Sequence, residues 1–205
     1  MNILNGLFGV SKIYKSKLEM NYFFKFFIPL LIISIISRLH YLFRKAGDLD
    51  KANLGGDPCN HFNIANNVSK GIGPYTDYII HYWFYHPSIP AMSDVYMPGF
   101  HFFLGIFLYL FGKTYFVGRI FNFFISLVTI YISYIIGKKI HSKTLGILSA
   151  AITSFNIFHI ENSTVVMSPM FTLLVMQIGL LFLIISINSS KYWYITGFVS
   201  GLIYL

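Results

Sequence analysis

A series of long apolar runs, separated by short polar segments, constrains this chain more than any other feature of its sequence. The first run, Tyr22 to Phe43, has 22 residues, and a helix rising about 1.5 Å per residue would cover the roughly 30 Å hydrocarbon core of a bilayer. Further spanning helices are predicted at residues 116–137, 144–160, 165–187 and 192–205. The sequence therefore predicts an all-α membrane protein built as a multi-span helical bundle.

The balance of charged and apolar residues excludes several other classes of protein. Charged residues make up 11% of the chain and hydrophobic residues 56%, whereas a soluble domain carries about 25% charged residues. An aromatic content of 19% excludes a disordered tail. Cys59 is the single cysteine, which excludes a disulfide within the chain. The net charge of +8 reflects lysines placed between apolar runs, so it indicates orientation in a membrane and argues against nucleic-acid binding.

The first and last apolar runs differ in how they end. Lys25 and Arg38 lie near the two ends of the first run, where we expect their long side chains to reach the lipid headgroups. No small-residue cleavage site follows this run, so a signal peptide is not expected. The last run reaches Leu205 without a cap or a basic stop, and we expect from this the N-terminal part of a larger membrane protein.

Lysines predict how the spans are oriented in the cell membrane. Residues 1–25 hold four lysines against one glutamate, so the N-terminus is expected in the cytoplasm and residues 44 onward outside. If residues 97–112 crossed the membrane, the basic loop 138–143 would fall outside, against the positive-inside rule. A helix over residues 97–112 would also reach only about 24 Å, which is short for a span. We therefore predict an interfacial or re-entrant helix there.

The predicted extracytoplasmic loop, residues 44–115, holds most of the acidic side chains of the protein. Its carboxylates are Asp48, Asp50, Asp57, Asp77 and Asp94, five of the seven in the chain. Glu161 falls in a second, short outer loop at residues 159–164. Acidic residues can accumulate in whichever loop is longest, because they contribute little to topology. The alternative is an active site at the outer interface, where carboxylates are candidates for acid-base chemistry.

Within this loop, residues 60–70 have the spacing of a short amphipathic helix lying on the membrane. Phe62, Ala65 and Val68 recur every third residue and would form an apolar face. Asp57 and Pro58 precede the helix in positions that suit a cap and a first turn. Capping is therefore a structural explanation for Asp57 that competes with a catalytic one.

Three segments together resemble a known family of membrane enzymes. They read GGDPCNHFNIANNVSKGIGPYTD, VYMPGFHFFLGIFLYLFG and VGRIFNFFISLVTIYISYIIGKKIHSKTLGILSAAITSF, and they lie within residues 38–183. Their order and spacing resemble the GT-C superfamily of integral-membrane glycosyltransferases, in particular the protein O-mannosyltransferase and aminoarabinose-transferase type. The resemblance implies transfer of a sugar from a polyprenyl-phosphate donor to a protein, lipid or glycan acceptor at the extracytoplasmic face of the membrane.

The resemblance also implies roles for individual residues. Asp57 matches the first-loop catalytic aspartate and would act as the general base. Arg119 would bind the donor phosphate, because a guanidinium binds phosphate oxygens bidentately and stays charged, and Lys113 could assist it. The expected substrate contacts are Asp94, Tyr96, Pro98, Asn122 and Glu161.

The chain departs from the family pattern at one acidic position. Ser168 and Pro169 stand where many relatives carry an acidic residue, and the nearest carboxylate is Glu161. No cofactor is expected, and the sequence does not support a divalent metal. His61, His81, His86 and His101 have spacings that match no zinc motif, so interfacial packing or acceptor binding is the preferred interpretation.

Two other functions stay open from the sequence alone. Half of a membrane transporter would be expected to carry ionisable residues near the middle of its spans, and the spans from Phe116 onward have none. The chain could also be a membrane fragment without activity of its own, since later helices contribute to the site in GT-C enzymes.

Overall fold

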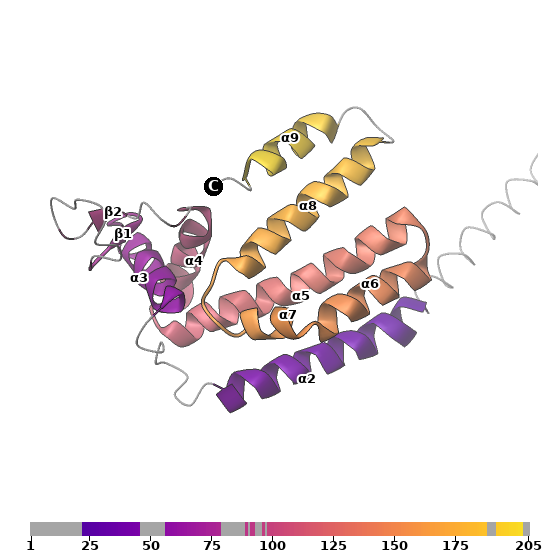
Figure 1. Ribbon diagram of the computed structural model, residues 1–205, viewed down its shortest axis with the longest axis horizontal. Helices are drawn as coiled ribbons and strands as arrows, with labels where there is room; N and C mark the ends of the chain where they lie inside the picture. Colours follow the sequence, from indigo (N-terminus) through magenta and orange to yellow (C-terminus); the bar gives the residue numbers. More distant parts are fainter. Residues whose placement is uncertain are drawn as a thin grey trace, which may run out of the picture.

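A computed structural model describes residues 22–45, 56–78, 89, 91–92, 96, 98–187 and 192–202, and these are almost entirely helical (Figure 1). The helices and strands in chain order are η1 (Phe23–Phe27, a π-helix), α2 (Ile28–Lys45), α3 (Asp57–Ser69), β1 (Tyr75–Thr76), β2 (Ala91–Met92), α4 (Pro98–Phe111), α5 (Tyr115–Ile140), α6 (Lys143–Phe155), α7 (Ile157–Asn162), α8 (Pro169–Ile187) and α9 (Trp193–Leu202). The predicted all-α class is confirmed.

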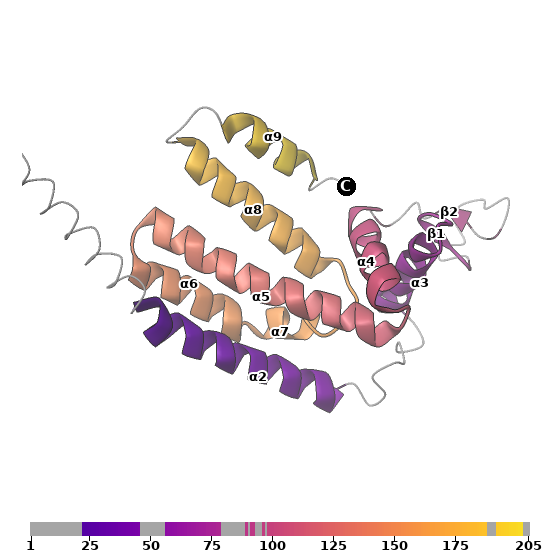
Figure 2. The same cartoon turned by 180° about the vertical axis from the view of Figure 1, so that it is seen from behind.

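Within the described ranges, three helices are long and apolar enough to cross a membrane. They are Phe23–Arg44, which joins η1 to most of α2, then Tyr115–Ile140 and Pro169–Ile187. In Figures 1 and 2, α2, α5, α6 and α8 run side by side along the long direction of the molecule. The prediction of a helical membrane protein is confirmed by this arrangement.

Small residues allow α5 and α6 to lie unusually close together. A Cβ atom added to Gly137 would lie 2.6 Å from Ser149 Oγ, and one added to Gly146 would lie 2.7 Å from the carbonyl oxygen of Tyr134. Glycines at such positions let helix backbones approach and pack in a membrane. His141 and Ser142 form the turn between these two helices, and the lysines around it lie in the last turn of α5 and at the start of α6.

The predicted span at residues 144–160 consists of two helices in the structure. Asn156 has an extended backbone, with ψ of 121°, and separates α6 from α7. Its side chain accepts a hydrogen bond from the backbone N–H of His159 at 3.1 Å and so caps α7. The expected short outer loop at residues 159–164 begins inside α7, because this cap starts a new helix.

The expectation that Arg38 reaches the headgroups is wrong, because this side chain is 0% exposed inside the bundle. Its Nε donates to Ser126 Oγ at 3.2 Å, its Nη1 to the Ser154 carbonyl at 3.3 Å, and its Nη2 to His159 Nδ1 at 2.7 Å. Ser34, one turn earlier on α2, also accepts from Nη1. Small polar residues of α2, α5 and α6 together with α7 therefore solvate the guanidinium.

The hydrogen bonds of His159 define the position of its proton. A guanidinium only donates, so His159 Nδ1 accepts from Arg38 and the ring proton sits on Nε2. Nε2 then donates to Thr129 Oγ1 at 2.7 Å, and that hydroxyl donates to the Ser126 carbonyl at 2.8 Å. We call Ser34, Arg38, Ser126, Thr129, Ser154 and His159 the Arg38 cluster.

At one end of the bundle, α3 and α4 pack against each other beside the start of α5 (Figures 1 and 2). A Cβ on Gly105 of α4 would lie 2.6 Å from Val68 Cγ1, so the two helices are in close contact. The shared apolar core consists of Ala65, Phe100, Leu104, Leu108, Tyr115 and Val166. The helix predicted at residues 60–70 is confirmed as α3, and β1 pairs with β2 in antiparallel register beside it.

Candidate functional site

Asp57 is the first residue of α3, and its carboxylate is exposed. Gly56 precedes it with φ of 93°, a left-handed conformation that favours glycine, and occupies the N-cap position without a side-chain capping bond. The capping interpretation of Asp57 is therefore wrong. The carboxylate instead sits at the positive end of the helix, where a negative charge is stabilised.

A tyrosine far away in sequence holds one oxygen of this carboxylate. Tyr96 donates its hydroxyl proton to Asp57 Oδ1 at 2.6 Å. The same hydroxyl oxygen accepts from Asn60 Nδ2 at 3.1 Å, and Tyr78 donates to Asn60 Oδ1 at 2.7 Å. These four residues, Asp57, Asn60, Tyr78 and Tyr96, are called the Asp57 network below.

The two tyrosines of the Asp57 network stay protonated near neutral pH. Burial raises the pKa of Tyr96, and its hydrogen bond to Asp57 raises it further, while that from Asn60 lowers it. Burial raises the pKa of Tyr78 to about 12. Tyr96 has one hydroxyl proton, and Asp57 receives it. Tyr96 was expected to bind substrate directly, whereas its hydroxyl is engaged by Asp57 and Asn60.

Two buried histidines pack behind this network. The ring of His61 contacts the ring of Tyr96 at a tilt of 50°, with centroids 4.5 Å apart, and His61 Nδ1 lies 2.8 Å from His101 Nε2. Burial lowers the pKa of His61 to about 4, opposed by the charge of Asp57, so His61 is neutral near pH 7. Among the described residues no group of three His, Cys, Asp or Glu could hold a metal ion, and His81 and His86 lie outside those residues.

Asp77 carries a second carboxylate near α3, but internal hydrogen bonds occupy it. It accepts from Asn63 Nδ2 at 2.8 Å and from Asn67 Nδ2 at 2.9 Å, and its own N–H donates to Asn63 Oδ1 at 3.0 Å. The hydrogen bonds from Asn67 and Asn63 lower the pKa of Asp77. Asp77 thus connects the segment after β1 to α3. Asp57 differs, because one of its carboxylate oxygens has no partner among the described residues.

Arg119 lies near the start of α5, where α3 packs against it. Its guanidinium carbon is 4.9 Å from the ring centroid of Tyr115, and Tyr115 contacts Phe62 of α3 with centroids 5.5 Å apart. The side chain is 7% exposed, and its Nε has no hydrogen-bond partner in the described part of the chain. A buried donor without a partner costs free energy, so this guanidinium is suited to an anionic ligand.

The other predicted site residues are spread over several elements. Asn122 is buried and donates to the carbonyls of Val165 and Met167, which holds the loop between α7 and α8. Glu161 lies in α7 and accepts from the Tyr41 hydroxyl at 2.7 Å. Lys113 is exposed between α4 and α5, Pro98 begins α4, and Asp94 lies outside the described residues.

The sequence analysis did not identify Asn60 as a member of the site. Asn60 is one turn after Asp57 on α3, so helical spacing alone places the two side chains near one another. Its hydrogen bonds to Tyr78 and Tyr96 join residues 18 and 36 positions away, and no local pattern in the sequence predicts them.

The comparisons with known proteins define first the class and then the family. A family model described as dolichyl-phosphate-mannose-protein mannosyltransferase matches residues 87–205. The match covers more than half of the chain, so the chain belongs to this family and is a membrane glycosyltransferase of the GT-C type. No curated protein and no solved structure matches the chain.

Proposed function

We propose that this chain forms the part of a GT-C glycosyltransferase that activates the acceptor and binds the donor phosphate at the extracytoplasmic face. Asp57 is the base, and Arg119 binds the phosphate of a polyprenyl-phosphate sugar. One observation carries the proposal: an exposed carboxylate and a buried, incompletely paired guanidinium lie on helices that pack together through Phe62 and Tyr115. The family supports the class of donor.

The chemistry needs few groups from the protein. The acceptor hydroxyl gives its proton to Asp57 while its oxygen bonds to the anomeric carbon of the sugar. The bond between that carbon and the phosphate oxygen breaks, and the polyprenyl phosphate leaves with the electron pair. Arg119 stabilises the phosphate charge through two parallel N–H bonds, and Lys113 adds a second positive charge at the same end of α5.

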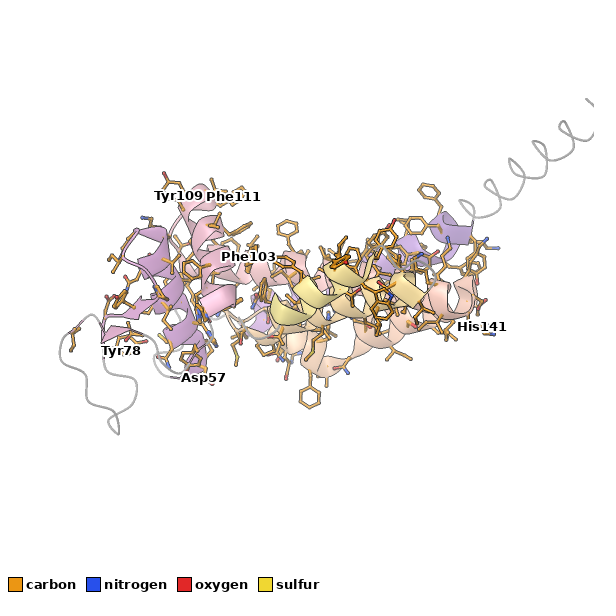
Figure 3. The ribbon with its side chains drawn as sticks, turned by 90° about the horizontal axis from the view of Figure 1, so that it is seen from above. Asp57, Tyr78, Phe103, Tyr109, Phe111 and His141 are labelled. Carbon is orange, nitrogen blue, oxygen red and sulfur yellow. The ribbon has the colours of Figure 1, made fainter. Side chains whose placement is uncertain are left out.

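The charges at the two ends of the bundle support an extracytoplasmic site. Asp57 and His141 lie at opposite ends of the molecule in Figure 3, and His141 sits in the basic turn between α5 and α6. The positive-inside rule favours the basic end in the cytoplasm, which supports the proposed orientation with Asp57 outside. In the same view α4 runs across the long direction of the bundle, which supports the proposed interfacial helix. Its exposed apolar residues are Phe102, Phe103, Ile106, Tyr109, Leu110 and Phe111.

The base is tested by Asp57→Asn in the complete protein, assayed with dolichyl phosphate mannose and membrane protein as acceptor. We expect loss of at least about a thousandfold in transfer, because an amide cannot take up the acceptor proton. The matched control is Asp77→Asn, whose single amide oxygen can still accept from one of the two asparagines Asn63 and Asn67, and it should keep transfer. Full activity of Asp57→Asn excludes Asp57 as the base.

The side of the membrane is tested with Cys59, the single cysteine, which is partly exposed two residues after Asp57. A membrane-impermeant maleimide should label Cys59 in intact cells. Labelling that appears only after permeabilisation contradicts the proposed orientation. Cys59→Ser is the control for background labelling.

A further inference from the structure

We infer that Tyr96 is a positioning residue that orients the Asp57 carboxylate, held in turn by Asn60 and Tyr78. This inference rests on the proposed role of Asp57 as the base. It assigns to the Asp57 network a function in the reaction that goes beyond the base itself.

The hydrogen bonds around Asp57 are directional. Because the Tyr96 proton goes to Oδ1 at 2.6 Å, the other carboxylate oxygen is left for the acceptor hydroxyl. Tyr96 in turn is fixed from two sides, by Asn60 Nδ2 at 3.1 Å and by the His61 ring at 4.5 Å. A general base works only within hydrogen-bond reach of the proton that it removes, so a carboxylate with one oxygen fixed is prepared for this task.

Other titratable and charged groups lie on the elements packed around the network, among them Cys59, His61, Tyr78, His101, Tyr115 and Arg119. Asp77 is already held by Asn63 and Asn67. Among the described contacts of Asp57, Tyr96 is the side chain that donates to its carboxylate.

The test is the Tyr96→Phe variant of the complete protein, which keeps the ring against His61 and removes the hydroxyl. With dolichyl phosphate mannose as donor and a serine- and threonine-rich peptide as acceptor, kcat should fall about tenfold while the KM values stay within about twofold.

Two further variants complete the comparison. Asn60→Ala keeps Asp57 and the Tyr96 hydroxyl but removes the hydrogen bond from Asn60 to Tyr96, and it should lower kcat about threefold with KM unchanged. Tyr109→Phe is the control, because Tyr109 is 71% exposed on α4 and lies on the other side of the α3 and α4 pair in Figure 3. It should match the wild type in both kcat and KM.

Each outcome decides one question. A Tyr96→Phe enzyme with raised KM and unchanged kcat means that Tyr96 binds substrate. One with unchanged kcat and KM means that the Tyr96 hydroxyl has no part in the reaction. Either result overturns the inference. If Tyr96→Phe does not accumulate in the membrane, the kcat and KM of Asn60→Ala decide instead. If Asp57→Asn keeps transfer in the same assay, the proposed function itself fails, and this result is distinct from any result with Tyr96→Phe.

Discussion

The Arg38 cluster and the Asp57 network both centre on an ionisable side chain, but they use it in opposite ways. Every nitrogen of Arg38 has a partner inside the protein, drawn from the helices and the α7 segment around it. Asp57 has one oxygen held by Tyr96 and is exposed. A buried charge with all of its partners supplied holds helices together, whereas a partly satisfied charge at the surface is available to a ligand.

This contrast bears on the transporter alternative. An ionisable residue inside a membrane bundle is by default a functional candidate, and Arg38 is such a residue. Its hydrogen bonds to Ser126, Ser154 and His159 already account for it as a packing element. Substitutions in the Arg38 cluster should therefore change stability first, and substitutions in the Asp57 network should change catalysis first.

The largest effect on stability is expected from Arg38→Met. Methionine is similar in length but leaves His159 Nδ1 and the Ser154 carbonyl without their donor, so unfolding should become easier by about 3 kcal/mol. The measurement is the midpoint of thermal unfolding in detergent, followed by size-exclusion chromatography. The thermal midpoint of Arg38→Lys should fall between those of Arg38→Met and the wild type. An ammonium group keeps the charge but cannot reach the acceptors on all four residues. Equal midpoints for Arg38→Met and the wild type would show that the cluster does not hold the bundle.

A smaller loss is expected from Gly146→Leu at the contact of α5 and α6. The first carbon of the new side chain would lie 2.7 Å from the carbonyl oxygen of Tyr134. Overpacking of this kind costs about 1 to 3 kcal/mol. Gly197→Leu is the matched control, because a Cβ there meets nothing within 4 Å. A thermal midpoint for Gly146→Leu no lower than that of Gly197→Leu would contradict the close packing.

The positions of the helices follow from the apolar runs, because length and composition are enough to identify a helix that can span a bilayer. The break at Asn156 cannot be predicted in the same way, because a single asparagine does not interrupt an apolar run. Only the structure shows that the Asn156 side chain accepts from the His159 N–H and caps a new helix. The burial of Arg38 was also missed. A long basic side chain near the end of a run can reach the headgroups or turn inward, and the choice depends on whether serines of other helices face it.

The candidate site was predictable only in part, for a similar reason. Asp57 and Arg119 were identified from segments that resemble a family, and each lies at the end of a helix that the sequence predicts. The bond from Tyr96 to Asp57 joins residues 39 positions apart in the sequence. Periodicity carries no information about such a contact, so only the folded chain shows which tyrosine reaches the carboxylate.

The smallest expected effect concerns Asp77. Both oxygens of its carboxylate accept hydrogen bonds from asparagines, whereas Tyr96 holds only one oxygen of Asp57. Because hydrogen bonds from Asn67 and Asn63 lower its pKa in the folded protein, Asp77 contributes stability above its unfolded pKa of about 3.9 and loses it as the pH falls through the lower folded value. Since the side chain is exposed, the contribution is below about 1 kcal/mol. Thermal midpoints at pH 7 and pH 3 should therefore differ slightly less in Asp77→Asn than in the wild type. An equal or larger difference in the variant would mean that Asn63 and Asn67 hold the neutral side chain as firmly as the charged one, and that the segment after β1 is fixed by shape rather than by charge.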